Sequence, residues 1–189
     1  DYLLRYSLEL ETQGSPSLLD LQKFSAPWSY QLTIHRNGET RPVTVDLVET
    51  FNWLLGLRVE QQDAPVTLTA DFEADAGGRA VVKKGSLRKA ASGWTFQAVT
   101  GRDRTDRLHL VLWRSLTGDA VKDNAVLDAF FQKQGYNSRD AEFDTIYVNG
   151  DNNLANLALV ADTPDAPSAY KVKLIETEFH RLMWDVRDV

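Results

Sequence analysis

A nearly continuous apolar run in the middle of the chain, LHLVLW at residues 108–113, limits the folds that this sequence can adopt. Such a run is typical of a central β-strand that is buried within a sheet. The segment before it, residues 94–99, alternates apolar with polar side chains, and a polar turn at 101–106 separates the two segments. Together they predict a hairpin that contributes to the core of a sheet.

The clearest helix is predicted at residues 46–55. Asp46 stands three residues before Glu49, which is a capping arrangement, and Gly56 provides a stop signal. Between them the apolar residues recur at helical spacing: Leu47, Val48, Phe51, Leu54 and Leu55. Before this helix, alternating residues 30–34, the turn pair Asn37-Gly38 and a return segment near 40–45 predict a hairpin.

The rest of the chain mixes strand and helix patterns. Strands are predicted at 66–72, 143–148 and 170–175, and loops at 74–78, 83–92 and 149–167. A helical face ends at Gly135, and a last helical stripe covers 179–186. We therefore expect an α/β or α+β fold, a mixed sheet with hairpins and about three helices packed on it. We expect one domain over 1–189, with subregions at 1–60, 61–150 and 151–189.

The amino-acid composition argues against several classes of function. The chain has no cysteine, and its three histidines lack ligand-like spacing, so we expect no metal site and no catalytic cysteine. No apolar run is long enough to span a membrane, and we expect a cytoplasmic protein. The five tryptophans lie inside apolar patterns, which favours core packing over base stacking. Asp1 and the apolar residues after it indicate a fragment of a longer protein.

Several short strings occur in an order that resembles the C-terminal region of type III restriction-modification DNA-adenine methyltransferases. They are LRY at 4–6 with SPSLL at 15–19, VDLVETFNWLLGL at 45–57, LVLWR at 110–114, FDTIYVNGDNNL at 143–154, and KLIE at 173–176 with EF at 178–179. The set covers most of the chain, although no single string is a mechanistic motif.

This resemblance implies a domain that lies downstream of the catalytic part of the modification subunit. Members of the family bind S-adenosylmethionine with a Phe-x-Gly-x-Gly loop and position adenine with an Asp-Pro-Pro-Tyr-like loop. The chain contains neither motif, has no adjacent prolines, and has no two glycines separated by one residue. We therefore expect no catalytic residue and no cofactor in this chain, with S-adenosylmethionine bound elsewhere in the parent enzyme.

Two groups of basic residues stand near predicted hairpin turns, although the chain carries a net charge of −6. If the sheet brings them together, they can neutralise DNA phosphates without reading sequence. A solvated charged surface is the simpler interpretation, because Asp103 and Asp106 lie among the arginines. The candidates are Lys83, Lys84, Arg88 and Lys89 in the first group and Arg102, Arg104 and Arg107 in the second.

A second candidate site is the loop that follows the predicted strand at 143–148. Loops at the ends of strands commonly carry ligands in α/β sheets. The alternative is that its Asn and Asp side chains make turns and that Gly150 supplies a positive φ, which favours a structural role. The candidate residues are Asn149, Asp151, Asn152 and Asn153.

Two functions follow from the resemblance and the basic groups. The first is a non-catalytic domain for fold completion and assembly, whose partners are the upstream methyltransferase domain, a second modification subunit and the ATP-dependent restriction subunit. The second is a non-specific module that holds the backbone of duplex DNA. The salt dependence of DNA binding separates the two hypotheses.

Overall fold

The apolar run forms strand β9 (Leu108–Arg114), which lies inside a seven-stranded mixed sheet. The computed structural model describes residues 24–36, 39–159 and 169–184. The strings at 4–6 and 15–19, the turn pair Asn37-Gly38, much of the expected loop at 149–167 and the last residues of the expected helix at 179–186 lie outside the described residues.

Parallel and antiparallel pairing meet at β9. This strand pairs antiparallel with β8 (Trp94–Arg102) on one side and parallel with β10 (Thr145–Val148) on the other. Beyond β10 lies β13 (Val172–Leu174), also parallel. The other side of β8 is shared by β3 (Arg58–Gln62) at its end and β4 (Val66–Thr69) at its start, and β7 (Arg88–Lys89) pairs with β4.

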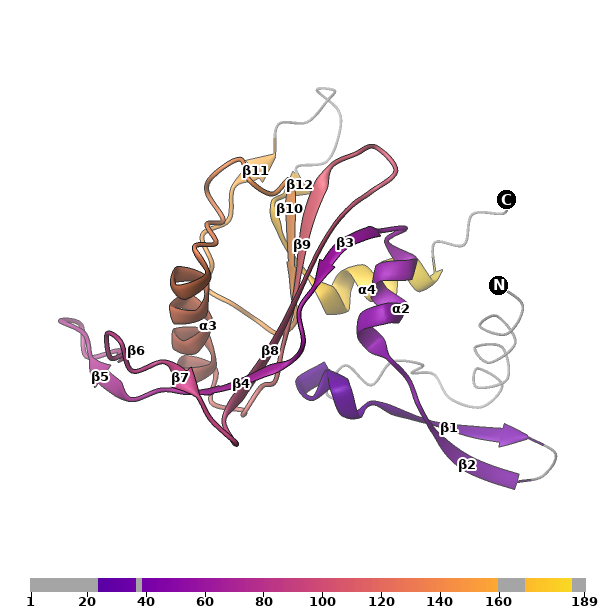
Figure 1. Ribbon diagram of the computed structural model, residues 1–189, viewed down its shortest axis with the longest axis horizontal. Coiled ribbons are helices and arrows are strands. Elements are labelled where there is room, and N and C mark those ends of the chain that lie inside the picture. The colour runs from indigo at the N-terminus through magenta and orange to yellow at the C-terminus, as the bar shows by residue number, and fades with distance from the viewer. Residues whose placement is uncertain (1–23, 37–38, 160–168, 185–189) are drawn as a thin grey trace.

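The run in β9 is apolar because the strand is covered on both faces. Leu110 and Leu112 join a core formed with helix α3 (Ala120–Gln134). Val111 and Trp113 point to the other face and join a second core with α2 (Leu47–Leu54) and α4 (Ile175–Trp184). Figure 1 shows α3 on one side of the sheet and α2 and α4 on the other.

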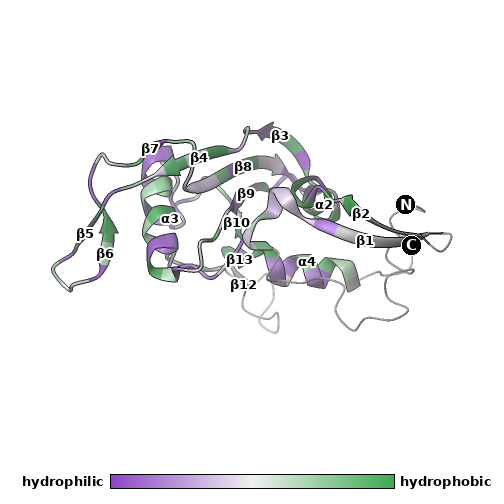
Figure 2. Cartoon of the chain, turned by 90° about the horizontal axis from the view of Figure 1, so that it is seen from below, coloured by the Kyte–Doolittle hydropathy of each residue, from purple (hydrophilic) through white to green (hydrophobic). Residues whose placement is uncertain are grey.

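Local signals explain where the helices begin and end. Asp46 caps α2 by accepting a hydrogen bond from the Glu49 amide, and Asp119 caps α3 in the same way through Lys122. Gly135 ends α3 with φ 75°, the left-handed conformation that favours glycine. Figure 2 shows that hydrophobic and hydrophilic residues alternate along α3 and α4, as expected of helices that cover a sheet on one side.

Two hairpins extend from the body at opposite ends of the molecule (Figure 1). One consists of β1 (Gln31–Arg36) and β2 (Glu39–Thr44), the other of β5 (Phe72–Ala74) and β6 (Ala80–Val82), and each forms a separate two-stranded sheet. The strands β11 (Ala158–Leu159) and β12 (Ala169–Tyr170) form a third such pair. A short 3-10 helix, η2 (Pro27–Ser29), precedes β1.

The expected fold class is confirmed, since the chain forms a mixed sheet with hairpins and helices on both faces. Some expected boundaries were wrong. The strand expected at 66–72 is divided into β4 and β5, and the loop expected at 83–92 contains β7. Trp53 is 57% exposed, so core packing does not extend to this tryptophan. Within the described ranges, no helix is both long and apolar enough to cross a membrane.

Candidate functional site

The structure places the two groups of basic residues at opposite ends of β8. Arg88 and Lys89 form β7, which pairs with β4 beside the first residues of β8. Arg102 is the last residue of β8, and Arg104 and Arg107 follow in the turn to β9. At about 3.3 Å per residue, the length of β8 separates the groups by roughly 26 Å. The sheet therefore does not bring them together.

Carboxylates already neutralise several of these cations. Arg88 pairs with Asp71 at 3.1 Å, Arg102 with Glu60 at 3.0 Å, and Arg107 with Asp103 at 3.0 Å. The remaining members, Lys83, Lys84, Lys89 and Arg104, are exposed and have no ion pair in the part of the chain that the structure describes. The unpaired charge is thus concentrated near β7.

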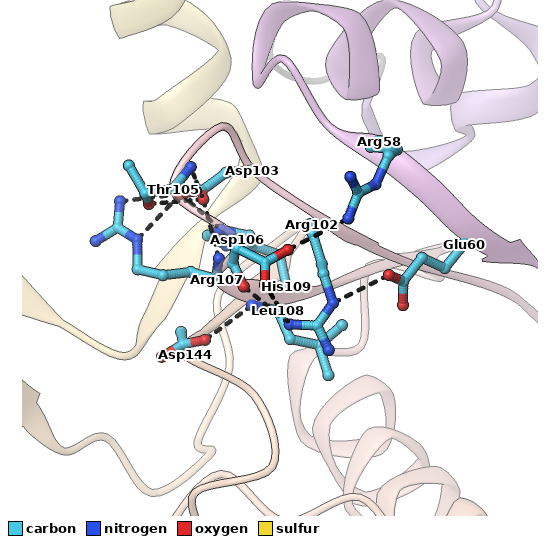
Figure 3. A network of polar contacts seen from close by, with 10 residues as sticks. All are labelled: Arg58, Glu60, Arg102, Asp103, Thr105, Asp106, Arg107, Leu108, His109 and Asp144. Carbon is cyan, nitrogen blue, oxygen red and sulfur yellow. Dashed lines mark hydrogen bonds and ion pairs between the residues drawn. The ribbon is translucent and has the colours of Figure 1, made fainter.

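The turn between β8 and β9 is held by a dense polar network (Figure 3). Asp103 accepts hydrogen bonds from the backbone and hydroxyl of Thr105 at 2.8 and 2.7 Å, and from the backbone and Nε of Arg107 at 3.1 and 3.0 Å. Asp106 has a φ of 63° and pairs with Arg58 at 3.2 Å. On the neighbouring side, the Leu108 amide donates to Asp144 at 2.8 Å. The network fixes the shape of this turn.

A polar pocket of about 260 Å³ lies beside this turn. Its floor is the start of the parallel strands, where His109, Thr145, Tyr147 and Lys173 share one face of the sheet. Its rim includes Leu55 and Leu57 after α2, Asp103 and Arg107 in the turn, and Glu178, Arg181 and Leu182 on α4.

Burial and the nearby ions set the electrostatics of this pocket. His109 is 5% exposed, its Nε2 lies 3.2 Å from Asp103 Oδ2, and the ring is not aligned for a hydrogen bond. Burial lowers the pKa of His109, and the Asp103 carboxylate opposes that change. Burial acts to raise the pKa of Asp103, but hydrogen bonds from Thr105 and Arg107 bring it well below its ordinary value.

A second polar network lies at the opposite end of the parallel strands, where the expected loop site begins. Asn149 is fully buried: its Oδ1 accepts from the Arg114 amide at 2.7 Å, and its Nδ2 donates to the carbonyls of Phe24 and Arg114 at 2.9 and 2.8 Å. The buried Arg114 guanidinium donates to the carbonyl oxygens of Asn149, Asp123 and Asp151 at 3.0, 3.0 and 2.8 Å. These hydrogen bonds occupy polar groups that could otherwise bind a ligand.

The other residues of this loop have different environments. Asn152 makes a local turn by accepting from the Leu154 amide at 3.3 Å, while Asp151 and Asn153 are exposed. Gly150 has φ 74°, and a Cβ at this position would come within 2.7 Å of Leu116. The Gly150 amide donates to Glu176 at 2.7 Å, and burial raises the pKa of that carboxyl. The loop therefore has a structural role at Asn149 and Gly150.

A groove of about 680 Å³ lies between the β5–β6 hairpin and α3. Its walls consist mainly of alanine and valine: Ala80, Val81, Val82, Ala120, Val121, Ala125 and Ala129. Val121 is 58% exposed, and the Asp128 carboxylate has no hydrogen bond or ion pair among the described residues. Burial raises the pKa of Asp128 and Arg114 lowers it. Asn153 is the loop candidate that reaches this groove.

Comparisons of the chain with protein-family models, curated proteins and solved structures found no match. Its function is therefore argued from its own residues.

The sequence interpretation named Arg107 in the polar pocket and Asn153 in the groove, but it missed the other residues that line the two hollows. His109 interrupts an otherwise apolar strand, and a polar side chain in such a strand was a usable signal for the polar pocket. Its neighbours Tyr147 and Lys173 come from other strands, and only the parallel pairing brings them to His109. The alanines of the groove give no signal in the sequence, because alanine is common in any helix.

Proposed function

We propose that this chain is a non-catalytic C-terminal domain of a type III restriction-modification adenine methyltransferase, and that it serves assembly and fold completion. The ordered strings in the sequence support the family, and the groove along α3 supports the role in assembly. S-adenosylmethionine would be bound by the upstream part of the cytoplasmic parent enzyme. The partners would be that upstream domain, a second modification subunit and the restriction subunit.

The groove is the observation that carries this proposal. Small side chains on α3 allow another backbone to approach closely, and the β5–β6 hairpin forms a second wall. An exposed valine in such a hollow is typical of a surface that a protein partner covers. The volume of about 680 Å³ has room for several side chains of an inserted segment.

The charge in the groove defines the chemistry of its partner. Asp128 is exposed in the groove and has no hydrogen bond or ion pair among the described residues. A lysine or arginine of the partner would stabilise the ionised carboxylate, and small apolar side chains would fill the space beside Val121. We therefore expect a protein segment with apolar residues and one basic residue, supplied by another subunit of the complex.

The test uses the full-length modification subunit with Val121→Glu. The added charge would lie in the groove, so self-association in light scattering or capture of the restriction subunit should fall by about tenfold or more. The matched control is Val59→Glu, because Val59 is 41% exposed on β3, outside the groove lining. Both variants should have unchanged melting temperatures. Unchanged association of the Val121→Glu subunit in both assays would contradict the proposal.

A second candidate function, a non-specific DNA-backbone module, is favoured by the unpaired cations near β7. Lys83 and Lys84 follow β6, and Lys89 lies on β7, so three exposed lysines stand close together in the chain. Such a cluster can neutralise neighbouring phosphates. This function differs from the first in its dependence on salt.

A further inference from the structure

The polar pocket beside the β8–β9 turn is unusual because it interrupts an apolar face of the sheet. His109 is in register with Thr145, and Tyr147 is in register with Lys173. Residues in register point to the same face, so these four side chains lie together on the side covered by α2 and α4. Their neighbours on that face, such as Val111 and Trp113, belong to the hydrophobic core.

Several hydrogen-bonding groups in this pocket have no partner. The hydroxyls of Thr145 and Tyr147 make no hydrogen bond within the described part of the chain, and both ring nitrogens of His109 are buried without one. The Lys173 ammonium has no ion pair there and lies 6.0 Å from the centre of the Tyr147 ring. Buried polar groups are normally satisfied, and His109 Nδ1 is buried without any partner, while its Nε2 lies 3.2 Å from Asp103. The two hydroxyls and the ammonium line the pocket beside it, so this set indicates a site for a ligand.

We propose that this pocket binds a small tetrahedral oxyanion, a phosphate group. Hydroxyl and ammonium donors match the oxygens of such an anion, and Lys173, Arg107 and Arg181 all line the pocket. The volume of about 260 Å³ is ample, because a cavity needs only about 10–15 Å³ on the same measure to hold one water.

The charge balance of the pocket selects an anion over a cation. Asp103 pairs with Arg107 at 3.0 Å, and Glu178 pairs with Arg181 at 2.8 Å. These pairs cancel, and Lys173 leaves one excess positive charge that a bound anion would neutralise. The raised pKa of Tyr147, due mainly to burial, keeps its hydroxyl protonated and able to donate.

Protonation of His109 makes anion binding at this site depend on pH. A bound anion favours the charged imidazolium, so binding raises the pKa of His109 and affinity increases as the pH falls through that pKa. The charged groups around His109 are Asp103 and Arg107 in the turn, Asp144 before β10, Lys173 on β13, and Glu178 and Arg181 on α4. Of these, Asp144 lies outside the pocket lining. Hydrogen bonds hold the pKa of Asp103 well below its ordinary value, so protonation of His109 is the change that increases the positive charge of the pocket.

The experiment is a calorimetric titration of the chain with inorganic phosphate. We expect saturable binding of phosphate. The pH dependence is measured with sulfate, a tetrahedral oxyanion whose charge is constant over the range: it should bind more tightly at about pH 5 than at about pH 8, because burial holds the pKa of His109 below its ordinary value of about 6.5. Lys173→Gln should weaken binding by about tenfold or more, and Lys173→Arg should restore most of it. The matched control is Arg139→Gln, which removes an exposed positive charge outside the pocket and outside both basic groups and should change nothing.

A parallel titration with short duplex DNA identifies the source of the phosphate. If only DNA binding depends on Lys173, the pocket holds a backbone phosphate; if inorganic phosphate binding depends on it as well, a free phosphate group is sufficient. Either result supports the proposal. Phosphate and DNA affinities that are both unaffected by Lys173→Gln in a folded variant would overturn it. A His109 resonance that does not shift on addition of phosphate would remove the link to pH.

Discussion

At the scale of single residues, Asn149 shows how a candidate ligand can be a structural residue. Its amide group satisfies the backbone amide and carbonyl of Arg114 at the end of β9 and the carbonyl of Phe24 before β1. One side chain thus completes the hydrogen bonding of three backbone groups in a fully buried place. The Arg114 guanidinium closes the same region from the other side by bonding the Asn149 carbonyl.

Replacement of Asn149 by alanine should destabilise the fold strongly. The change removes three hydrogen bonds and leaves buried backbone groups unsatisfied, at about 1–3 kcal/mol for each group left without a partner. We expect a total loss of about 3 kcal/mol or more in the free energy of unfolding, measured by urea denaturation. Asn153→Ala is the control, since Asn153 is exposed and should change stability by less than about 0.5 kcal/mol. Similar losses in the two variants would contradict this assignment.

At the scale of the elements, α2 joins the sheet through an aromatic cluster. The fully buried Phe51 ring lies 5.9 Å from Trp113 on β9, 5.5 Å from Tyr147 on β10 and 5.7 Å from Phe179 on α4, measured between ring centres. Leu54, one turn later, is only partly buried. The apolar stripe of α2 is therefore deepest in its first half, a gradient that helical spacing alone does not reveal.

This gradient sets the order of three substitutions in α2. Phe51→Ala should cost about 3–5 kcal/mol because it leaves a cavity between three rings. Truncation of a fully buried leucine to alanine lowers the free energy of unfolding by about 2–5 kcal/mol, and Leu54→Ala should cost less than this. Trp53→Ala should stay within about 0.5 kcal/mol because that side chain faces solvent. Denaturant melts of the three variants give the order directly, and a larger loss for Leu54→Ala than for Phe51→Ala would contradict it.

The sequence predicted those helices and strands whose own residues carry a periodic apolar pattern or a capping signal. The β8–β9 hairpin, α2 and α3 are examples, because buried faces and caps leave a periodic signal. Strands β3 and β7 were missed: every residue in them is exposed, and only pairing with β8 or β4 makes them strands. The polar pocket was missed for the same reason, since Lys173 meets His109 only through the order of the parallel strands.

At the scale of the whole molecule, the distribution of charge does not support a continuous DNA clamp. The cations at the β8–β9 turn are mostly neutralised by Asp103 and Glu60, whereas the unpaired lysines lie at the far end of β8. The net charge of −6 adds a general repulsion between the chain and a polyanion. This distribution confines any contact with DNA to a small area, and assembly stays the proposed main role.

DNA binding by the isolated chain should therefore be weak, non-specific and dependent on the lysines near β7. With three phosphates neutralised by Lys83, Lys84 and Lys89, the affinity should fall by about 40-fold between about 50 and 200 mM salt. Charge reversal by Lys84→Glu should weaken binding to every duplex equally, because a phosphate contact carries no sequence information.

Arg139→Glu is the matched control, since Arg139 is exposed on the loop after α3 and belongs to neither basic group. Fluorescence anisotropy with duplexes of unrelated sequence measures all of these effects. Equal losses in the two variants would show that only net charge matters, and undetectable binding at about 50 mM salt would eliminate the DNA-backbone function for this chain.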